Sequence, residues 1–283
     1  MSGYMSHRLA RFVVAICDLM GPRIIFSTSS VFPNTDLGFQ LAAEFGYDGV
    51  ELMVNHEKRS QSIEAVSRLS ERYDQPVTAV HAPCLVISQP VWGWDPVAKL
   101  ERTIDFALNV GAETVVTHPP FRWQREYKDR FIQVVQELSE IHSGKLNIAV
   151  ENMYSVEKFG RKIEPYLCLD DPALTQFAHT CLDTSHAAAA RIDSLDLYRS
   201  MGDRMKHLHL SDSTSTRGDE HLPPGMGTLP LQELASQMAA DGFAGDIVLE
   251  VATGKLPASA RQRTAKQCIE WTRQAFGVTA SVS

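Results

Sequence analysis

The fold of this chain is decided by residues 95–120, which read DPVAKLERTIDFALNVGAETVVTHPP. Asp95 followed by Pro96 predicts a helix start, because an aspartate caps the first turn and a proline fits the first helical position. The amphipathic pattern extends this helix to Val110, where a glycine predicts its end. Thr114–His118 then has the composition of a short buried strand. The stretch is therefore a helix followed by a strand, with a histidine at the strand's carboxyl end.

The same alternation of short apolar runs and amphipathic stretches continues along the rest of the chain. The predicted strands are Arg23–Ser27, Gly49–Met53, Val77–His81, Thr114–His118, Asn147–Glu151, Thr180–Asp183, Met205–Ser211 and Asp246–Glu250. The predicted helices are Asp36–Phe45, Ile63–Tyr73, Pro96–Val110, Glu126–His142, Asp171–Phe177, Ser194–Met201, Leu231–Asp241 and Ala260–Phe276. Eight strands, each followed by a helix, predict a single-domain α/β fold, the (β/α)8 TIM barrel.

A doubly wound open sheet is the alternative fold for such an alternation. That fold normally places a glycine-rich phosphate loop after its first strand, and residues 26–34, FSTSSVFPN, contain no glycine. No linker or low-complexity tract divides the chain. We therefore expect an N-terminal extension over residues 1–22 and one barrel over residues 23–283.

The composition is that of an ordinary globular protein, which excludes disordered and fibrous classes. The 283 residues include 44% hydrophobic and 22% charged residues, and the formal net charge is −7. This charge provides no basic footprint for nucleic acid, although carboxylates neutralised by cations would account for part of it. No apolar run approaches the roughly 18 residues that would span a bilayer, so no membrane partner is expected.

The cysteines and the N-terminus favour a cytoplasmic location. The five cysteines are widely spaced without a CxxC pair, as is typical of reduced thiols in a cytosolic protein; they are Cys17, Cys84, Cys168, Cys181 and Cys268. The apolar run Phe12–Cys17 is short and is followed by Asp18, with no small-residue cleavage site. A signal peptide is therefore not expected.

Histidines and carboxylates stand at the ends of most predicted strands or in the loops that follow. They are Glu51, His81, His118, Glu151, Asp183, His186, His209, Asp219, His221 and Glu250. In a barrel all the strands' carboxyl ends meet on one face, where active sites are built. Imidazoles and carboxylates brought together there form a site for one or more divalent metals, and cations offset the cost of burying several carboxylates. Any one of these residues could be merely structural, but the joint pattern predicts a metal site.

The motifs VHAP, THPP, VEN, CLDTSH, HLHLSD, EHLPPGMG and VLEV follow one another in this order. With them, the chain resembles the xylose isomerase-like TIM-barrel superfamily from about Ser27 to Phe276. That superfamily includes sugar and sugar-phosphate isomerases and epimerases, and the type IV apurinic/apyrimidinic endonucleases.

The resemblance to the epimerases implies one divalent metal held by Glu151, Asp183, His209 and Glu250. Glu151 and Glu250 would also be the catalytic pair: one removes a proton next to a carbonyl and the other returns it, while the metal polarises that carbonyl. His186 would bind a substrate oxygen, and Arg217 a hydroxyl or a phosphate. The segment DGVEL, with Glu51 as a further substrate-binding candidate, also resembles this branch.

The resemblance to the endonucleases implies three metals, usually zinc, and every ligand type finds a match. The nine ligands would be His81, His118, Glu151, Asp183, His186, His209, Asp219, His221 and Glu250. Three departures count against this reading. Ser211 and Thr214 replace an Asn and a Lys, and Cys84-Leu85 replaces a Tyr-Leu pair that wedges into DNA.

The loop after the fourth strand adds Trp123, whose flat face would suit a sugar ring, although a lid or subunit contact explains it equally well. Together the residues and the resemblance predict a cytoplasmic, divalent-metal-dependent isomerase or epimerase. Its substrate would be a sugar, a sugar phosphate or a related hydroxy-carbonyl compound, and its cofactor one to three ions of Zn, Mn, Mg or Co. A zinc-dependent phosphodiesterase is the second prediction. Nucleic acid is disfavoured as a partner but not excluded, and the sequence allows a homo-oligomer.

Overall fold

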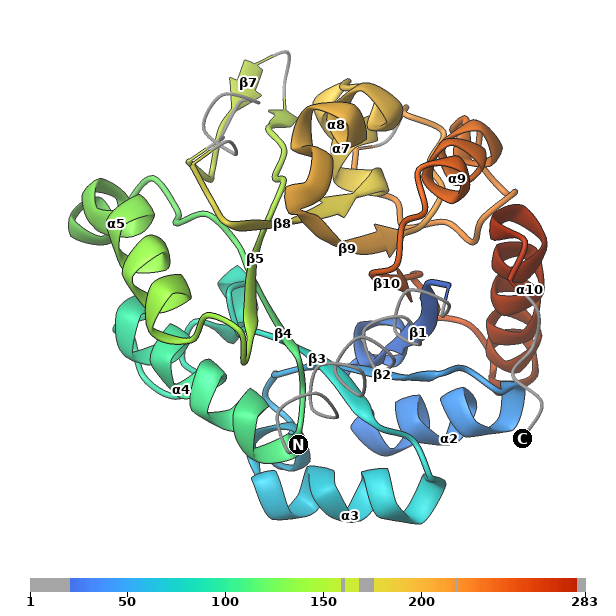
Figure 1. The fold of residues 1–283 in the computed structure, drawn as a ribbon, viewed down its shortest axis with the longest axis horizontal. Coiled ribbons are helices and arrows are strands. Elements are labelled where there is room, and N and C mark those ends of the chain that lie inside the picture. The colour runs from blue at the N-terminus through green and yellow to red at the C-terminus, as the bar shows by residue number, and fades with distance from the viewer. Residues whose placement is uncertain (1–20, 159–160, 168–175, 217, 279–283) are drawn as a thin grey trace, which may run out of the picture.

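Eight parallel strands close into a barrel surrounded by helices (Figure 1). The structure is a computed structural model, and it describes residues 21–158, 161–167, 176–216 and 218–278. The barrel strands are β1 (Arg23–Ser27), β2 (Gly49–Met53), β3 (Val77–His81), β4 (Thr114–Thr117), β5 (Asn147–Glu151), β8 (His179–Asp183), β9 (Met205–Leu210) and β10 (Asp246–Leu249). Since β1 pairs in parallel with both β2 and β10, the sheet has no open edge. The predicted TIM barrel is therefore confirmed.

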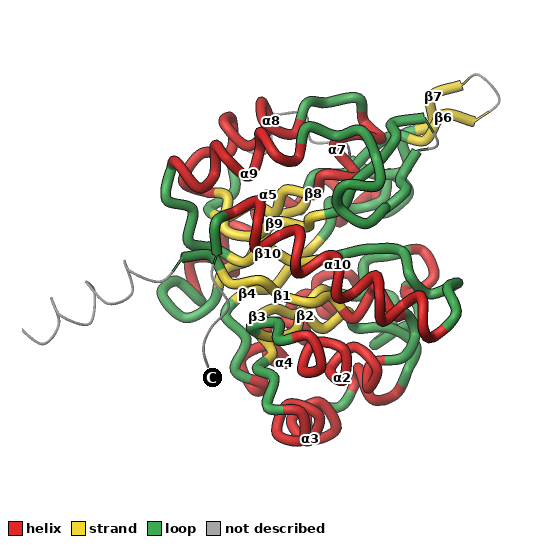
Figure 2. Tube along the Cα trace, turned by 90° about the vertical axis from the view of Figure 1, so that its right-hand side faces the viewer, coloured by secondary structure: helices red, strands yellow, loops and turns green. Residues whose placement is uncertain are grey.

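The helices lie outside this ring of strands (Figures 1 and 2). They are α2 (Thr35–Phe45), α3 (Ile63–Tyr73), α4 (Pro96–Val110), α5 (Arg125–Ile141), α7 (Thr184–Ala190), α8 (Ser194–Met201), α9 (Leu231–Ala240) and α10 (Ala258–Phe276). Their ends follow the expected chemistry. The Asp95 side chain accepts hydrogen bonds from the backbone N–H groups of Val97 and Ala98, and Gly111 ends α4 at φ 80°. None of the described helices is long and apolar enough to cross a membrane.

Most predicted elements agree with the structure to within two residues. His118 and Glu250 come just after β4 and β10 rather than inside them. The short helix α7 and a hairpin of β6 (Val156–Lys158) and β7 (Arg161–Ile163) were not predicted; the hairpin projects from the barrel (Figure 2). Of the predicted helix Asp171–Phe177, residues 171–175 lie outside the described residues and the last two are not helical.

The buried apolar residues of the described chain form one large core and two small clusters, one of which consists of Phe121, Met153 and Tyr166. The main core lies between the strands and the helices; Ile24 and Phe26 of β1 belong to it. Inside the barrel lies a much smaller cluster of Val116, Ala149 and Cys181. Because strand side chains alternate between two faces, the residues between the outward-facing ones point toward the barrel axis. The small apolar cluster on that axis leaves room for polar side chains at the carboxyl end.

Candidate metal centre at the carboxyl end of the barrel

A cavity of about 230 Å³ lies at the carboxyl ends of the strands. The titratable residues of its lining, here called the titratable wall, are His81, His118, Glu151, His186, Asp219, His221 and Glu250. The apolar residues of its lining, here called the apolar wall, are Phe32, Met53, Leu85, Ile87, Val251 and Ala252. Seven of the nine metal-type residues expected from the sequence thus line one cavity. Asp183 and His209 contact this wall from beneath, where both are fully buried.

The first group of possible ligands consists of His81, His118 and Glu151. Oε2 of Glu151 lies 2.9 Å from His118 Nε2 and 3.3 Å from His81 Nε2. The two Nε2 atoms are 3.2 Å apart, so at least one of them must present a lone pair. Two imidazole nitrogens and one carboxylate oxygen that converge in this way match the ligand chemistry of zinc.

The second group consists of Glu151, Asp183, His209 and Glu250. His209 Nδ1 lies 2.8 Å from Glu250 Oε2, 3.4 Å from Glu151 Oε1 and 3.7 Å from Asp183 Oδ2. His209 Nδ1 and Asp183 Oδ2 are buried, yet neither makes a well-aligned hydrogen bond within the described part of the chain. Buried polar atoms normally have a partner, so two such atoms facing each other fit the donor set of a divalent cation.

The third group consists of Asp183, His186 and His221, with Asp219 next to it. Asp219 lies 3.0 Å from His221 Nε2 and 3.5 Å from His186 Nε2. Glu151 belongs to the first and second groups, and Asp183 to the second and third. A divalent metal therefore fits each group, and neighbouring ions would share a carboxylate.

The charges within the titratable wall oppose the effect of burial. Burial alone would raise the pKa of Glu151, but His118, His209 and His186 hold it well below its usual range. The pKa of Glu250 likewise falls to about 2, because His209 outweighs burial. Burial lowers the pKa of His221, yet Asp183 and Asp219 raise it to about 10. The neighbouring imidazoles therefore favour the ionised forms of Glu151 and Glu250, whereas burial lowers the pKa of His118.

A continuous series of histidine rings runs through these groups. Ring centroids lie 5.2 Å apart for His207 and His209, and 5.8 Å for His209 and His81. The series continues from His81 to His118 at 4.8 Å, then to His186 at 6.3 Å and to His221 at 5.6 Å. Each imidazole of the site is thus next to another one.

Three residues that the sequence did not single out position the ligands. Asn152 follows Glu151. Its side-chain oxygen accepts a hydrogen bond from the backbone N–H of Asp183 at 2.7 Å, and its side-chain nitrogen donates one to the backbone carbonyl of Asp183 at 3.0 Å. Ser185 donates to Asp219 Oδ1 at 2.6 Å and accepts from the backbone N–H of His221 at 3.1 Å. Tyr154 donates to Asp219 Oδ2 at 3.2 Å. Asn152 and Ser185 stand inside the motifs VEN and CLDTSH, which is the signal that could have identified them.

The loop that carries His221 is fixed by Asp212. The Asp212 carboxylate accepts hydrogen bonds from the backbone N–H groups of Gly225, Gly227 and Leu229. A side chain at Gly227 would bring its Cβ within 2.4 Å of Asp212 Oδ1, so only glycine allows this approach. The loop therefore holds His221 rigidly against the barrel.

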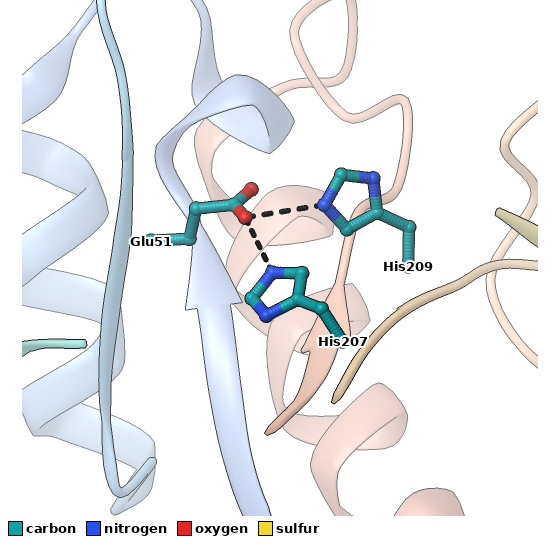
Figure 3. A group of neighbouring side chains, drawn as sticks. All are labelled: Glu51, His207 and His209. Atoms are coloured by element: carbon teal, nitrogen blue, oxygen red, sulfur yellow. Dashed lines mark hydrogen bonds and ion pairs between the residues drawn. The ribbon is translucent and has the colours of Figure 1, made fainter. Parts of the chain in front are cut away.

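Of the expected substrate-binding residues other than His186, Glu51 and Trp123 do not line the cavity. Glu51 is fully buried on the far edge of the His209 ring from Glu250, where both its oxygens accept hydrogen bonds (Figure 3). Trp123 is 59% exposed and stacks on Phe121, with ring centroids 4.3 Å apart. Arg217 lies outside the described residues. Their roles toward a substrate stay predictions.

Comparison with known proteins agrees with this architecture. The chain is 44% identical to an uncharacterized protein of Mycobacterium leprae over 262 residues, which cover 86% of this chain and 93% of that protein. It is 21% identical to fructoselysine 3-epimerase of Shigella flexneri over 245 residues, covering 76% of this chain and 84% of the epimerase. The crystal structure of the IolI protein with a bound zinc atom superposes with a TM-score of 0.68 at 17% identity, covering 92% and 100% of the two chains.

A family profile decides the classification. The profile of the xylose isomerase-like TIM barrel matches residues 39–275, which are most of the chain. This match confirms the resemblance that the motifs indicated. The chain belongs to the xylose isomerase-like TIM barrel family.

Proposed function

We propose that this protein is a divalent-metal-dependent isomerase or epimerase of a sugar, a sugar phosphate or a related hydroxy-carbonyl compound. One observation carries the proposal: Glu151 and Glu250 approach the same nitrogen of His209 and both line the cavity. Two carboxylates around one reaction centre suit a proton transfer in which one removes a proton and the other returns it. The epimerase relative and the zinc-containing structural neighbour support this class of chemistry.

The exposure of the site residues suggests a different role for each in proton transfer and substrate binding. Glu250 is the more accessible of the two acids, because 12% of its side chain is exposed against 1% for Glu151. Its pKa near 2 keeps it ionised at neutral pH, which is the form that a general base requires. His186 reaches the cavity and would bind a substrate oxygen. A divalent cation held by Glu151, Asp183, His209 and Glu250 would polarise the substrate carbonyl.

Solvent-hydrogen exchange tests this proposal. A panel of ketoses and ketose phosphates is incubated in deuterated water with the protein and Mn²⁺, Co²⁺ or Zn²⁺. A substrate should incorporate deuterium at the carbon next to its carbonyl. Glu151→Gln and Glu250→Gln should each slow this exchange by about 10²–10⁴-fold, the usual contribution of a general acid or base. Glu140→Gln, an exposed change on α5, is the matched control. Normal exchange in both active-site variants would refute the proton-transfer role.

A zinc-dependent phosphodiesterase is the second candidate, and the sharing of Glu151 and Asp183 among three groups favours it. Three neighbouring cations are suited to activating a water and stabilising a leaving oxygen. The DNA-facing positions support it less. Cys84 is only partly exposed and lies 3.5 Å from Thr117 Oγ1, and Ser211 contacts His221. About three bound zinc ions together with nicking of abasic DNA would favour this candidate over the first.

A further inference from the structure

Glu51 lies at the centre of a buried hydrogen-bond system on the barrel axis (Figure 3). Its Oε2 lies 2.7 Å from His207 Nε2 and 3.1 Å from His209 Nε2. Its Oε1 accepts a hydrogen bond from Ser27 Oγ at 3.0 Å. All four side chains are fully buried, so water does not compete for these contacts.

The geometry determines where the two histidines carry their protons. A carboxylate only accepts hydrogen bonds, so both Nε2 atoms that face Oε2 must carry a hydrogen. In a neutral His209 ring, the lone pair is then on Nδ1. That nitrogen is the atom that faces Glu151, Asp183 and Glu250 and lacks an aligned hydrogen bond among the described residues.

His207 holds the carboxylate from the other side. It lies two residues before His209 on β9, so both rings project from the same face of the strand. The other ring nitrogen of His207, Nδ1, lies 3.9 Å from Asp246 Oδ2. Asp246 in turn accepts a hydrogen bond from Arg23 Nε at 2.7 Å. Glu51 is therefore fixed between two rings and a hydroxyl, and it has no freedom to turn toward the cavity.

We propose that Glu51 is a positioning residue: it holds the His209 ring with its proton on Nε2 and presents Nδ1 to the metal. His207 and Ser27 hold Glu51 in turn. This inference rests on the metal site of the proposed function but not on its reaction. Outer carboxylates of this kind orient ligating histidines and increase their basicity, and their loss typically costs about 10–100-fold in metal affinity.

Nuclear magnetic resonance of the zinc-loaded wild-type protein, with histidine labelled by ¹⁵N, tests the proton positions directly. His209 should show a slowly exchanging Nε2–H proton and a metal-bound Nδ1. The opposite pattern, with Nε2 on zinc and a proton on Nδ1, would overturn the proposal, because Glu51, His207 and His209 would then hold an ion themselves. This measurement needs no substitution, so it does not depend on whether a variant folds.

Chelator competition with zinc alone tests the energetic role. Glu51→Gln keeps the shape of the side chain and removes its charge, and it should weaken the tightest zinc site by about 10-fold or more. Glu140→Gln, the same change of side chain at an exposed position on α5, is the matched control, and it should change the affinity by less than about threefold. Unchanged affinity in Glu51→Gln would refute the positioning role alone. A wild-type protein that binds no zinc would refute the metal site as well.

Discussion

The two walls of the cavity differ in where their residues come from. The titratable wall is built by the ends of β3 to β10 and the loops that follow them, whereas half of the apolar wall, namely Phe32, Leu85 and Ile87, comes from the segments after β1 and β3. Phe32 is 37% exposed and Ile87 is 55% exposed, but Glu151 of the titratable wall is 1% exposed. Backbone pairing fixes the first wall, while the second presents apolar surface to whatever enters. We infer that the first wall holds the chemistry and the second contacts the part of the substrate that does not react.

The largest effect is expected for zinc binding by Glu151→Gln. Glu151 contributes to two of the three groups, so its loss should weaken the tightest zinc site by about 100-fold and lower the number of bound ions. Equilibrium dialysis followed by elemental analysis gives both quantities. Full stoichiometry with unchanged affinity would show that Glu151 is not shared between ions.

His118→Ala should affect only one group. It removes one of three side chains around the first candidate site, so the protein should bind one zinc fewer than wild type if more than one binds. The affinity of the remaining sites should change less, since His118 belongs to neither of the other groups and reaches the second group only through Glu151. His142→Ala, at the end of α5 and outside the cavity lining, is the control. If His118→Ala also weakens the remaining sites strongly, the groups do not act separately.

Zinc affinity should increase with pH. The pKa values of His186 and His209 lie well above their usual range and that of His221 is near 10, so these rings carry protons in the metal-free protein at neutral pH. Zinc must displace such a proton, so between about pH 6.5 and about pH 8 the affinity should rise about tenfold per pH unit for each proton released. Calorimetry in buffers of different ionisation enthalpy counts these protons. Binding without proton release would show that the rings are neutral before zinc enters.

The apolar wall should discriminate between ligands that bind the metal identically. Benzohydroxamate and acetohydroxamate share one chelating head and differ in the size of the apolar tail. Ile87→Ser should weaken benzohydroxamate about fivefold and leave acetohydroxamate within about twofold, because burial of a few carbon atoms is lost. Fluorescence or calorimetric titration of the zinc-loaded protein measures both constants. An equal loss for both ligands would mean that Ile87 acts on the metal site itself.

The smallest effect is expected for Trp123→Ala. Since Trp123 stacks on Phe121 and is not part of either wall, its removal should leave zinc and hydroxamate affinities within about twofold of wild type. A larger loss would restore the role toward a substrate that the sequence suggested for it.

The sequence was sufficient to predict the barrel because strands of period two and amphipathic helices are local patterns. The residues at the strand ends could also be predicted to meet, since a parallel barrel brings these ends together. The sequence does not predict helix α7, because this helix is short and begins at Thr184, inside the motif CLDTSH that indicates site residues. The buried environment of Glu51 and the outward stacking of Trp123 depend on register and loop conformation, which no local pattern encodes. The division into three groups depends on side-chain distances across the barrel for the same reason.

The series of histidine rings from His207 to His221 allows metal binding to be followed through the histidine resonances themselves. Each ring lies within 6.3 Å of the next, close enough for the magnetic field of one imidazole to shift the resonances of its neighbour. An ion entering any group would thus alter several histidine signals in a pattern that depends on the group. A zinc titration followed by these signals would reveal the order in which the groups bind the ion, and it requires no substrate.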